Sequence, residues 1–228
     1  MSTIADNIQL VSSRIQAATA AAGRSENSVQ LLAVSKTKPA SDLREAYAAG
    51  LRDFGENYLQ EALGKQLELS DLPLIWHFIG PIQSNKTRAI AEHFDWVHSV
   101  DRLKISQRLS EQRPAELPPL NICIQVNVSG EASKSGCTPA DLPALAEAIS
   151  TLPRLKLRGL MAIPEPTEDR AEQDAAFAAV QRLQASLNLP LDTLSMGMSH
   201  DLESAIAQGA TWVRIGTALF GARDYGQQ

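Results

Sequence analysis

Residues 74–100 read LIWHFIGPIQSNKTRAIAEHFDWVHSV and hold one complete succession of strand, helix and strand. The runs 74–79 and 96–100 are short, apolar and rich in β-branched and aromatic residues, which is typical of strands. The segment 84–93 between them predicts a helix. Strands that are joined by helices in this way form parallel sheets.

The same alternation continues along the chain after residues 23–24. Further strands are predicted at 31–34, 53–54 with its flanks, 122–128, 157–163, 193–196 and 212–215. Further helices are predicted at 40–49, 57–69, 102–111, 139–151, 168–187 and 200–207. Eight strands that alternate with helices favour a single (β/α)8 barrel of the TIM type over a doubly wound open sheet of fewer strands.

Local signals predict how two of the helices begin. An extra N-terminal helix is predicted over 2–22, because one helical face carries Ile4, Ile8, Val11 and Ile15. The helix at 139–151 is predicted to start with Pro139 at its first position, after Thr138 and before the acidic Asp141. No linker interrupts the pattern, so we expect residues 1–228 to form one domain.

Composition excludes several classes of function. The formal net charge is −5 and no cluster of Lys and Arg marks a nucleic-acid or membrane surface, so neither partner is expected. The N-terminus lacks a signal peptide, and no stretch reaches the roughly 20 apolar residues of a membrane span. We therefore expect a cytoplasmic protein in which Cys123 and Cys137 are reduced structural thiols.

Several common catalytic patterns are missing from the sequence. There is no GxSxG, Walker or GxGxxG motif. His93, His98 and His200 do not have the spacing of metal ligands, and neither cysteine lies beside a histidine cluster. We expect no metal site.

Lys36 is the first candidate for chemistry, because functional residues of a parallel barrel follow the carboxyl ends of its strands. It comes just after the predicted strand 31–34. An amine at the mouth of a barrel, flanked by apolar strand residues, can lose its proton more easily than a solvated amine and can then form a Schiff base. Position alone favours the other interpretation, a surface lysine at a strand end.

Glycine-rich segments follow the seventh and eighth predicted strands, at 197–199 and 216–217. In barrels these two loops commonly hold a phosphate with backbone N–H groups, and glycine lets the backbone approach the anion. Ser199 can also be explained as the N-cap of the helix at 200–207. The two interpretations are compatible, since a capped helix start is also an anion site.

Two polar residues lie inside predicted strands. Arg214 lies within 212–215, where burial of its charge is costly, so it either forms a buried ion pair or contacts a ligand. His77 lies within 74–79. A histidine in such a strand is more often a hydrogen-bonded core or barrel-lining residue than a base.

Seven segments carry a resemblance that runs from end to end of the chain. They are 31–37 (LLAVSKT), 54–58 (FGENY), 76–86 (WHFIGPIQSNK), 133–136 (SKSG), 158–161 (RGLM), 194–199 (LSMGMS) and 213–221 (VRIGTALFG). Together they resemble the YggS/PROSC family of pyridoxal 5′-phosphate (PLP) homeostasis proteins. The resemblance implies a barrel similar to the N-terminal domain of alanine racemase.

The same resemblance implies a set of cofactor-binding residues. They are Lys36, Asn57, His77, Met161, Ser199, Arg214, Gly216 and Thr217. Lys36 would hold PLP as an internal aldimine, while the residues at 199 and 216–217 would hold the phosphate. Arg214 would meet the ring nitrogen; because a guanidinium rarely gives up its proton, that nitrogen would stay unprotonated and the ring would be a weak electron sink.

An amino-acid racemase needs a second proton donor on the other face of the substrate carbon. In alanine racemase a β domain follows the barrel, and a tyrosine across the dimer interface is the second base. Tyr47, Tyr58 and Tyr225 match no such motif, and a chain that stops at Gln228 would leave no room for the β domain. We therefore expect no catalytic residues.

The expected function is intracellular PLP homeostasis, in which Lys36 captures PLP, protects its aldehyde and then releases or transfers it. Free amino acids or apo-enzymes that use PLP are the expected acceptors, and we expect a monomer. A PLP-dependent, racemase-like enzyme is the alternative. A regulatory module that binds partners through the outer surface of the barrel is a third hypothesis, and Lys38, Lys86 or Lys134 could offer a second cofactor position.

Overall fold

The computed structural model describes residues 1–132 and 135–223. The strands are β1 Gln30–Val34, β2 Asp53–Glu56, β3 Ile75–Phe78, β4 Trp96–Val100, β5 Leu120–Gln125, β6 Leu155–Met161, β7 Thr193–Ser195 and β8 Trp212–Ile215. The helices are α1 Ile4–Ala21, α2 Ala40–Ala48, α3 Leu59–Glu68, η1 Ser84–Lys86, α4 Thr87–His93, α5 Leu103–Gln112, α6 Leu142–Ser150, α7 Arg170–Ser186, α8 Leu202–Ala207 and α9 Thr217–Phe220.

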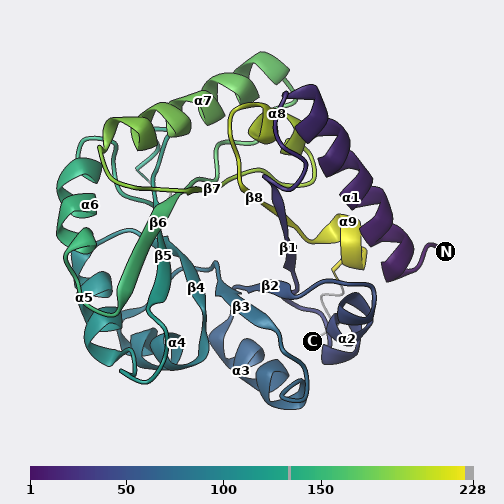
Figure 1. Ribbon diagram of the computed structural model, residues 1–228, viewed down its shortest axis with the longest axis horizontal. Coiled ribbons are helices and arrows are strands. Elements are labelled where there is room, and N and C mark those ends of the chain that lie inside the picture. Colours follow the sequence, from purple (N-terminus) through teal and green to yellow (C-terminus); the bar gives the residue numbers. More distant parts are fainter. Residues whose placement is uncertain (133–134, 224–228) are drawn as a thin grey trace.

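The strands close into a barrel in chain order, β1 through β8. All neighbouring pairs are parallel, and β8 returns to β1 with Leu32 opposite Arg214. Figure 1 shows the helices as an outer ring around the strands. This closure confirms the predicted barrel and excludes the open sheet, which would leave two unpaired edges.

The apolar residues of each strand separate into two cores because successive side chains point to opposite faces. Outward-facing residues such as Phe54, Phe78 and Val97 join the large core beneath the helices. Inward-facing residues form small clusters inside the barrel, one of which consists of Trp96, Cys123 and Met161. The barrel is therefore filled, and a ligand can reach it only at an end.

Helix α1 is the predicted extra helix and begins with a capping box between Thr3 and Asp6. Its face with Ile8, Val11 and Ile15 is buried against the rest of the molecule. The helix packs along α8 and α9, as Figure 1 shows. It thus covers the two elements that follow β7 and β8.

Three details of the prediction are wrong. Helix α6 starts at Leu142, not at Pro139, because residues 138–141 form a separate turn in which the Thr138 hydroxyl accepts from the Asp141 N–H at 3.1 Å. Ser199 is not the N-cap of α8; Asp201 occupies that position. The predicted strand at 122–128 ends at Gln125, because only an isolated bridge between Val126 and Cys137 continues it.

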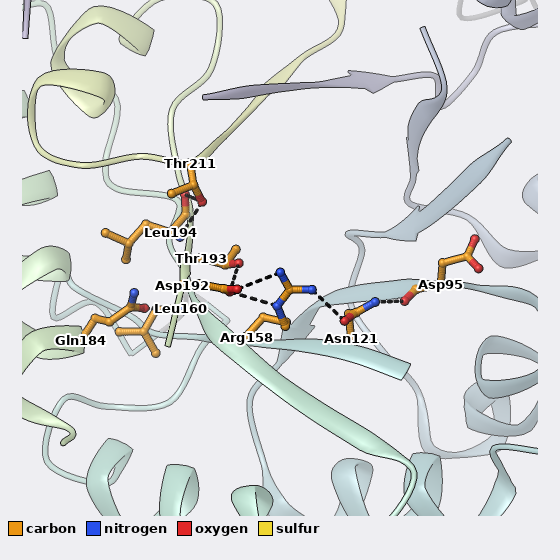
Figure 2. A network of polar contacts seen from close by, with 9 residues as sticks. All are labelled: Asp95, Asn121, Arg158, Leu160, Gln184, Asp192, Thr193, Leu194 and Thr211. Carbon is orange, nitrogen blue, oxygen red and sulfur yellow. Dashed lines mark hydrogen bonds and ion pairs between the residues drawn. The ribbon is translucent and has the colours of Figure 1, made fainter. Parts of the chain in front are cut away.

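A network of polar contacts lies at the end of the barrel where the strands begin (Figure 2). Arg158 forms a two-pronged ion pair with Asp192, with both N···O distances 2.9 Å, and donates to the Asn121 side chain. Its guanidinium also lies 4.6 Å from the centre of the Trp96 ring. These contacts join β5, β6 and the residue before β7 at this end of the barrel.

Candidate functional site

A cavity of about 260 Å³ opens at the end of the barrel where the strands finish. Its walls come mainly from residues that follow β1, β2, β3, β6, β7 and β8. The lining residues are Val34, Lys36, Asn57, Ile79, Ile163, Met198, Ser199, His200, Arg214, Gly216, Thr217 and Arg223. The barrel closure thus brings together six of the eight residues that the resemblance implied.

The loop that carries Lys36 is held on both sides of that residue. The Nζ atom of Lys65 donates to the carbonyl oxygen of Ser35 at 2.7 Å. On the other side, the N–H of Thr37 donates to Glu61 Oε1 at 2.5 Å. Thr37 has φ of +66°, a left-handed conformation that costs on the order of 1–3 kcal/mol for such a residue. The contacts to neighbouring residues hold it there.

The contacts of Ser35 and Thr37, on either side of Lys36, belong to a buried charge cluster. Lys65 Nζ lies 2.7 Å from both Glu56 and Glu61, and Glu56 also accepts from the Ser35 hydroxyl at 2.8 Å. Burial raises the pKa of Glu56, while the positive charge of Lys65 opposes the rise. Such a cluster needs every partner in place, because a lone buried charge is strongly unfavourable.

The neighbouring wall, formed after β7 and β8, has the features of an anion cradle. Gly216 and Thr217 lie at the start of α9, and Ser199 lies in the loop between β7 and α8. Gly197 in that loop has φ of +99°, and a Cβ there would come within 2.6 Å of the Ala205 side chain. Glycine is therefore required at 197 to shape the loop. The hydroxyls of Ser199 and Thr217 share this wall.

Helix α1 supports both parts of this wall from outside. Arg14 donates to the carbonyl oxygen of Ser199 at 2.9 Å and pairs with Glu203 on α8 at 2.8 Å. Asn7 donates to the carbonyl oxygen of Leu219 in α9 at 2.9 Å. The extra helix therefore fixes the backbone beside both Ser199 and Thr217.

Arg214 reaches the cavity from within the barrel. It donates to the Ser195 hydroxyl at 2.8 Å and to the carbonyl oxygen of Ala162 at 3.0 Å. Burial lowers its pKa to about 10, so the guanidinium is still protonated at neutral pH. Of its five N–H donors these bonds use two, which leaves donors for a ligand. Of the two predicted alternatives, a direct buried ion pair is absent from the described contacts.

The charge of the cavity favours an anionic ligand. Lys36, Arg214 and Arg223 line it together with His200, and none of the described lining residues is acidic. The Oδ1 atom of Asn57 is buried without a hydrogen-bond partner in the described structure. An unsatisfied acceptor of this kind is costly and is readily explained by a donor that arrives with a ligand.

His77 and Met161 do not line this cavity; both are fully buried inside the barrel. The His77 ring stacks on Trp96 and lies edge-on to Trp212, at the first positions of β4 and β8. Met161 packs on Trp96 and Cys123. The simpler interpretation of His77, a hydrogen-bonded barrel-lining residue, describes its position, and contact of either residue with a ligand remains a prediction.

Sequence reasoning missed several lining residues. Val34, Ile79, Ile163 and Met198 supply apolar walls, and their places at strand ends were the available signal. His200 was given no role, although it follows the predicted phosphate loop. Arg223 lies near the C-terminus, where no sequence pattern marks it.

The other candidate lysines lie elsewhere. Lys38 donates to the carbonyl oxygen of Ala222 at 2.7 Å and so ties the C-terminal segment to the loop after β1. Lys86 ends the short helix η1 and lines neither this cavity nor the one beside it. Lys134 and Tyr225 lie outside the described residues.

A second cavity of about 310 Å³ adjoins the first and shares Asn57, Ile79 and Ile163 with it. Its other walls are Pro81, Gln125, Ser135, Pro164 and Pro166. None of Ser199, Gly216 and Thr217 lines this second cavity. The described residues contain no cluster of three or more His, Cys, Asp or Glu that could hold a metal ion.

Comparison with known proteins identifies the family. The family model of the alanine racemase N-terminal domain matches residues 3–224. A protein of Pseudomonas aeruginosa named pyridoxal phosphate homeostasis protein is 78% identical over 226 residues, which are 99% of this chain and 98% of that protein. This chain belongs to the pyridoxal phosphate homeostasis protein family. The predicted resemblance is thereby confirmed.

Two solved structures are similar to this chain, one in sequence and fold and one in fold alone. PipY of Synechococcus elongatus with PLP bound is 46% identical, with a TM-score of 0.80, and the match covers 91% of this chain and all of that one. Alanine racemase of Corynebacterium glutamicum is 16% identical, with a TM-score of 0.65, and the match covers 96% of this chain and 62% of that one. The racemase shares the fold, and nothing more follows from that similarity. No helix among the described residues is long and apolar enough to cross a membrane.

Proposed function

We propose that this chain binds PLP in the cavity around Lys36 and takes part in PLP homeostasis. The observation that carries the proposal is the meeting, in one cavity, of a lysine amine, a wall with two hydroxyls and a glycine, and a buried guanidinium. The bound PLP of the PipY relative and the name of the Pseudomonas relative support it.

Each part of the cavity has a task in this proposal. The chemistry that PLP supplies is a reactive aldehyde carbon, and Lys36 Nζ is the amine that bonds to it covalently. Ser199, Gly216 and Thr217 hold the phosphate. Arg214 faces the ring nitrogen and, because it stays protonated, keeps that nitrogen an acceptor. This combination retains the cofactor without activating the ring for carbanion chemistry.

Release requires an incoming amine to replace Lys36. The second cavity gives a small amino acid a route to the bonded carbon, so free amino acids and apo-enzymes that use PLP are the proposed acceptors. We propose that this takes place in the cytoplasm and that the chain is a monomer. Cys123 and Cys137 are unpaired and buried, and burial raises the pKa of these thiols to about 12 and about 11, which fits a reducing compartment.

The test is a visible absorption spectrum of the purified protein before and after addition of an L-amino acid. We expect a yellow protein whose band shifts when the amine exchanges with Lys36, and a colourless Lys36→Ala variant. A wild-type protein that stays colourless after incubation with PLP would contradict the proposal.

A racemase-like enzyme is the second candidate, because His200 lines the cavity and could supply a second proton donor. Incubation of the loaded protein with single L-amino acids in deuterated water tests it. We expect no α-deuterium exchange at enzymatic rates. Sustained exchange that is lost in His200→Ala would establish the enzyme instead.

A further inference from the structure

Five polar side chains form a continuous chain of hydrogen bonds through the inside of the barrel. Asp53 Oδ1 lies 2.8 Å from His77 Nε2, and His77 Nδ1 lies 2.9 Å from His98 Nε2. His98 Nδ1 lies 2.7 Å from the Ser195 hydroxyl, which accepts from Arg214 at 2.8 Å. The chain links β2, β3, β4, β7 and β8 and ends at the candidate cofactor cavity.

With both histidines neutral, one set of donors and acceptors satisfies every bond of this chain of hydrogen bonds. A carboxylate only accepts, so His77 must donate from Nε2 to Asp53. The remaining ring nitrogen of a neutral His77 then accepts, and His98 must donate to it from Nε2. At the far end, Arg214 can only donate, so the Ser195 hydroxyl accepts from it and donates to His98 Nδ1. In this arrangement both neutral histidines carry their proton at Nε2.

Burial agrees with this arrangement. His77, His98 and Ser195 have no exposed surface, and the Asp53 side chain is 22% exposed at the outer end of the chain. Burial lowers the pKa of both histidines, against the opposing effect of Asp53 on His77, and the positive charge of Arg214 lowers the pKa of His98 further. A second positive charge beside Arg214 is thus disfavoured, and the one-way pattern of donors persists at neutral pH.

The chain of hydrogen bonds affects how Arg214 is oriented at the cavity, because Arg214 forms no ion pair with any described carboxylate. Its guanidinium is oriented by two acceptors alone, Ser195 Oγ and the carbonyl oxygen of Ala162. The carbonyl is fixed by the backbone. The hydroxyl is fixed only if its proton has an acceptor, and His98 Nδ1 is that acceptor.

We propose that Asp53, His77, His98 and Ser195 are positioning residues that orient the Arg214 guanidinium toward the cofactor cavity. They keep one rigid donor at the place where a pyridine nitrogen would sit. The proposal rests on the proposed function in one respect, the contact of Arg214 with that nitrogen. The hydrogen-bond chain itself exists without any ligand.

The first experiment uses the ligand-free protein. In ¹⁵N-labelled wild type, long-range ¹H–¹⁵N NMR should show His77 and His98 as neutral Nε2–H tautomers between pH 6 and 8. The signals of the exposed His93 and His200 in the same spectra act as internal references. An Nδ1–H tautomer at His98, or titration of His77 and His98 in this range, would overturn the proposal without any variant.

The second experiment asks whether the chain orients Arg214. Ser195→Ala should release His98 from its tautomer and let the Arg214 side-chain N–H signals, resolved in wild type, average through faster rotation. Ser110→Ala is the matched control, because the hydroxyl of this buried serine donates to the carbonyl oxygen of Pro153 on the outside of the barrel. Unchanged Arg214 signals in Ser195→Ala would overturn the positioning role.

The third experiment measures the protonation of the ring nitrogen in ¹⁵N-labelled PLP bound to the protein. The ring nitrogen should be unprotonated in wild type and in Ser110→Ala, and at least partly protonated in Ser195→Ala, with PLP affinity lowered about tenfold. An unchanged ring-nitrogen shift, with the Arg214 signals altered, would limit the chain to a structural role. If wild type bound no PLP at all, the proposed function would fail. The ligand-free spectra would still show whether the chain of hydrogen bonds orients Arg214.

Discussion

The Nζ atom of Lys65 lies 2.7 Å from the carbonyl oxygen of Ser35, the residue immediately before Lys36. Helix α3 thereby holds the loop after β1 through a side chain that is itself paired with two carboxylates. Lys36 is the residue that we propose bonds to the cofactor, and such a role would need a fixed backbone position. The contact explains how Lys36 keeps its place while Thr37 adopts a strained conformation.

Replacement of Lys65 by Met tests this contact. Glu56 is fully buried, and its loss of a charged partner should lower the free energy of unfolding by about 3–5 kcal/mol, measured by urea denaturation. Arg44→Met, which breaks the exposed pair with Asp71, should cost at most about 1 kcal/mol. Addition of Glu56→Gln to Lys65→Met should recover part of the loss. Equal effects of Lys65→Met and Arg44→Met would contradict the buried cluster.

Borohydride reduction of the PLP-loaded protein should fix the cofactor on Lys36. The reason is that this lysine alone among Lys36, Lys38 and Lys86 lines the cavity. Peptide mapping by mass spectrometry identifies the modified residue. An adduct found chiefly on Lys38 or Lys86 would refute the assignment, and Lys36→Ala provides the control for non-specific labelling.

The double variant Ser199→Ala and Thr217→Ala should weaken binding of the phosphorylated cofactor. Each hydroxyl lost from a charged partner is worth roughly tenfold to a hundredfold in affinity. Pyridoxal without phosphate is the matched ligand, since its affinity should change little. Equilibrium titration by absorbance measures both, and an equal loss for the two ligands would argue against a phosphate role for this wall.

Stability should fall as the pH drops below about 6.5. His77 faces Asp53, Asp95 and His98, while His98 faces His77 and Arg214, and burial lowers the pKa of both histidines below 6.5. The unfolded chain therefore binds protons that the folded chain excludes, and each histidine contributes up to about 1.4 kcal/mol per pH unit.

The measurement is urea denaturation between pH 5 and 7.5 in wild type and in His98→Gln. Glu56, whose pKa burial raises, acts in the opposite direction in both proteins and cancels in the comparison. We expect the slope of stability against pH to be smaller in His98→Gln. Parallel slopes would show that His98 is protonated in the folded state.

The sequence predicted the structure best where the prediction depends on a local pattern of residues. Alternating apolar runs and amphipathic segments predicted the barrel. The positions of Lys36, Ser199, Gly216 and Thr217 after predicted strands made them candidate site residues, and the structure places all four in one cavity. The errors at Pro139 and Ser199 arose because a proline or serine near a helix signals a turn as readily as a helix start. Near Pro139 the Thr138 hydroxyl accepts from the Asp141 N–H, and near Ser199 the Asp201 carboxylate accepts from the Met198 N–H at 2.7 Å. These hydrogen bonds decided the local structure.

The sequence by itself determined the order of strands and helices and the class of residue at each strand end. Only the tertiary structure decided what surrounds those residues. Ser195 lies 97 positions from His98, yet the two side chains meet because the closed barrel turns alternate residues of β4 and β7 into one interior. Lys65 meets Ser35 for the same reason, through packing of α3 beside the end of β1. Periodicity fixes the face on which a side chain lies, whereas closure of the barrel fixes its partners.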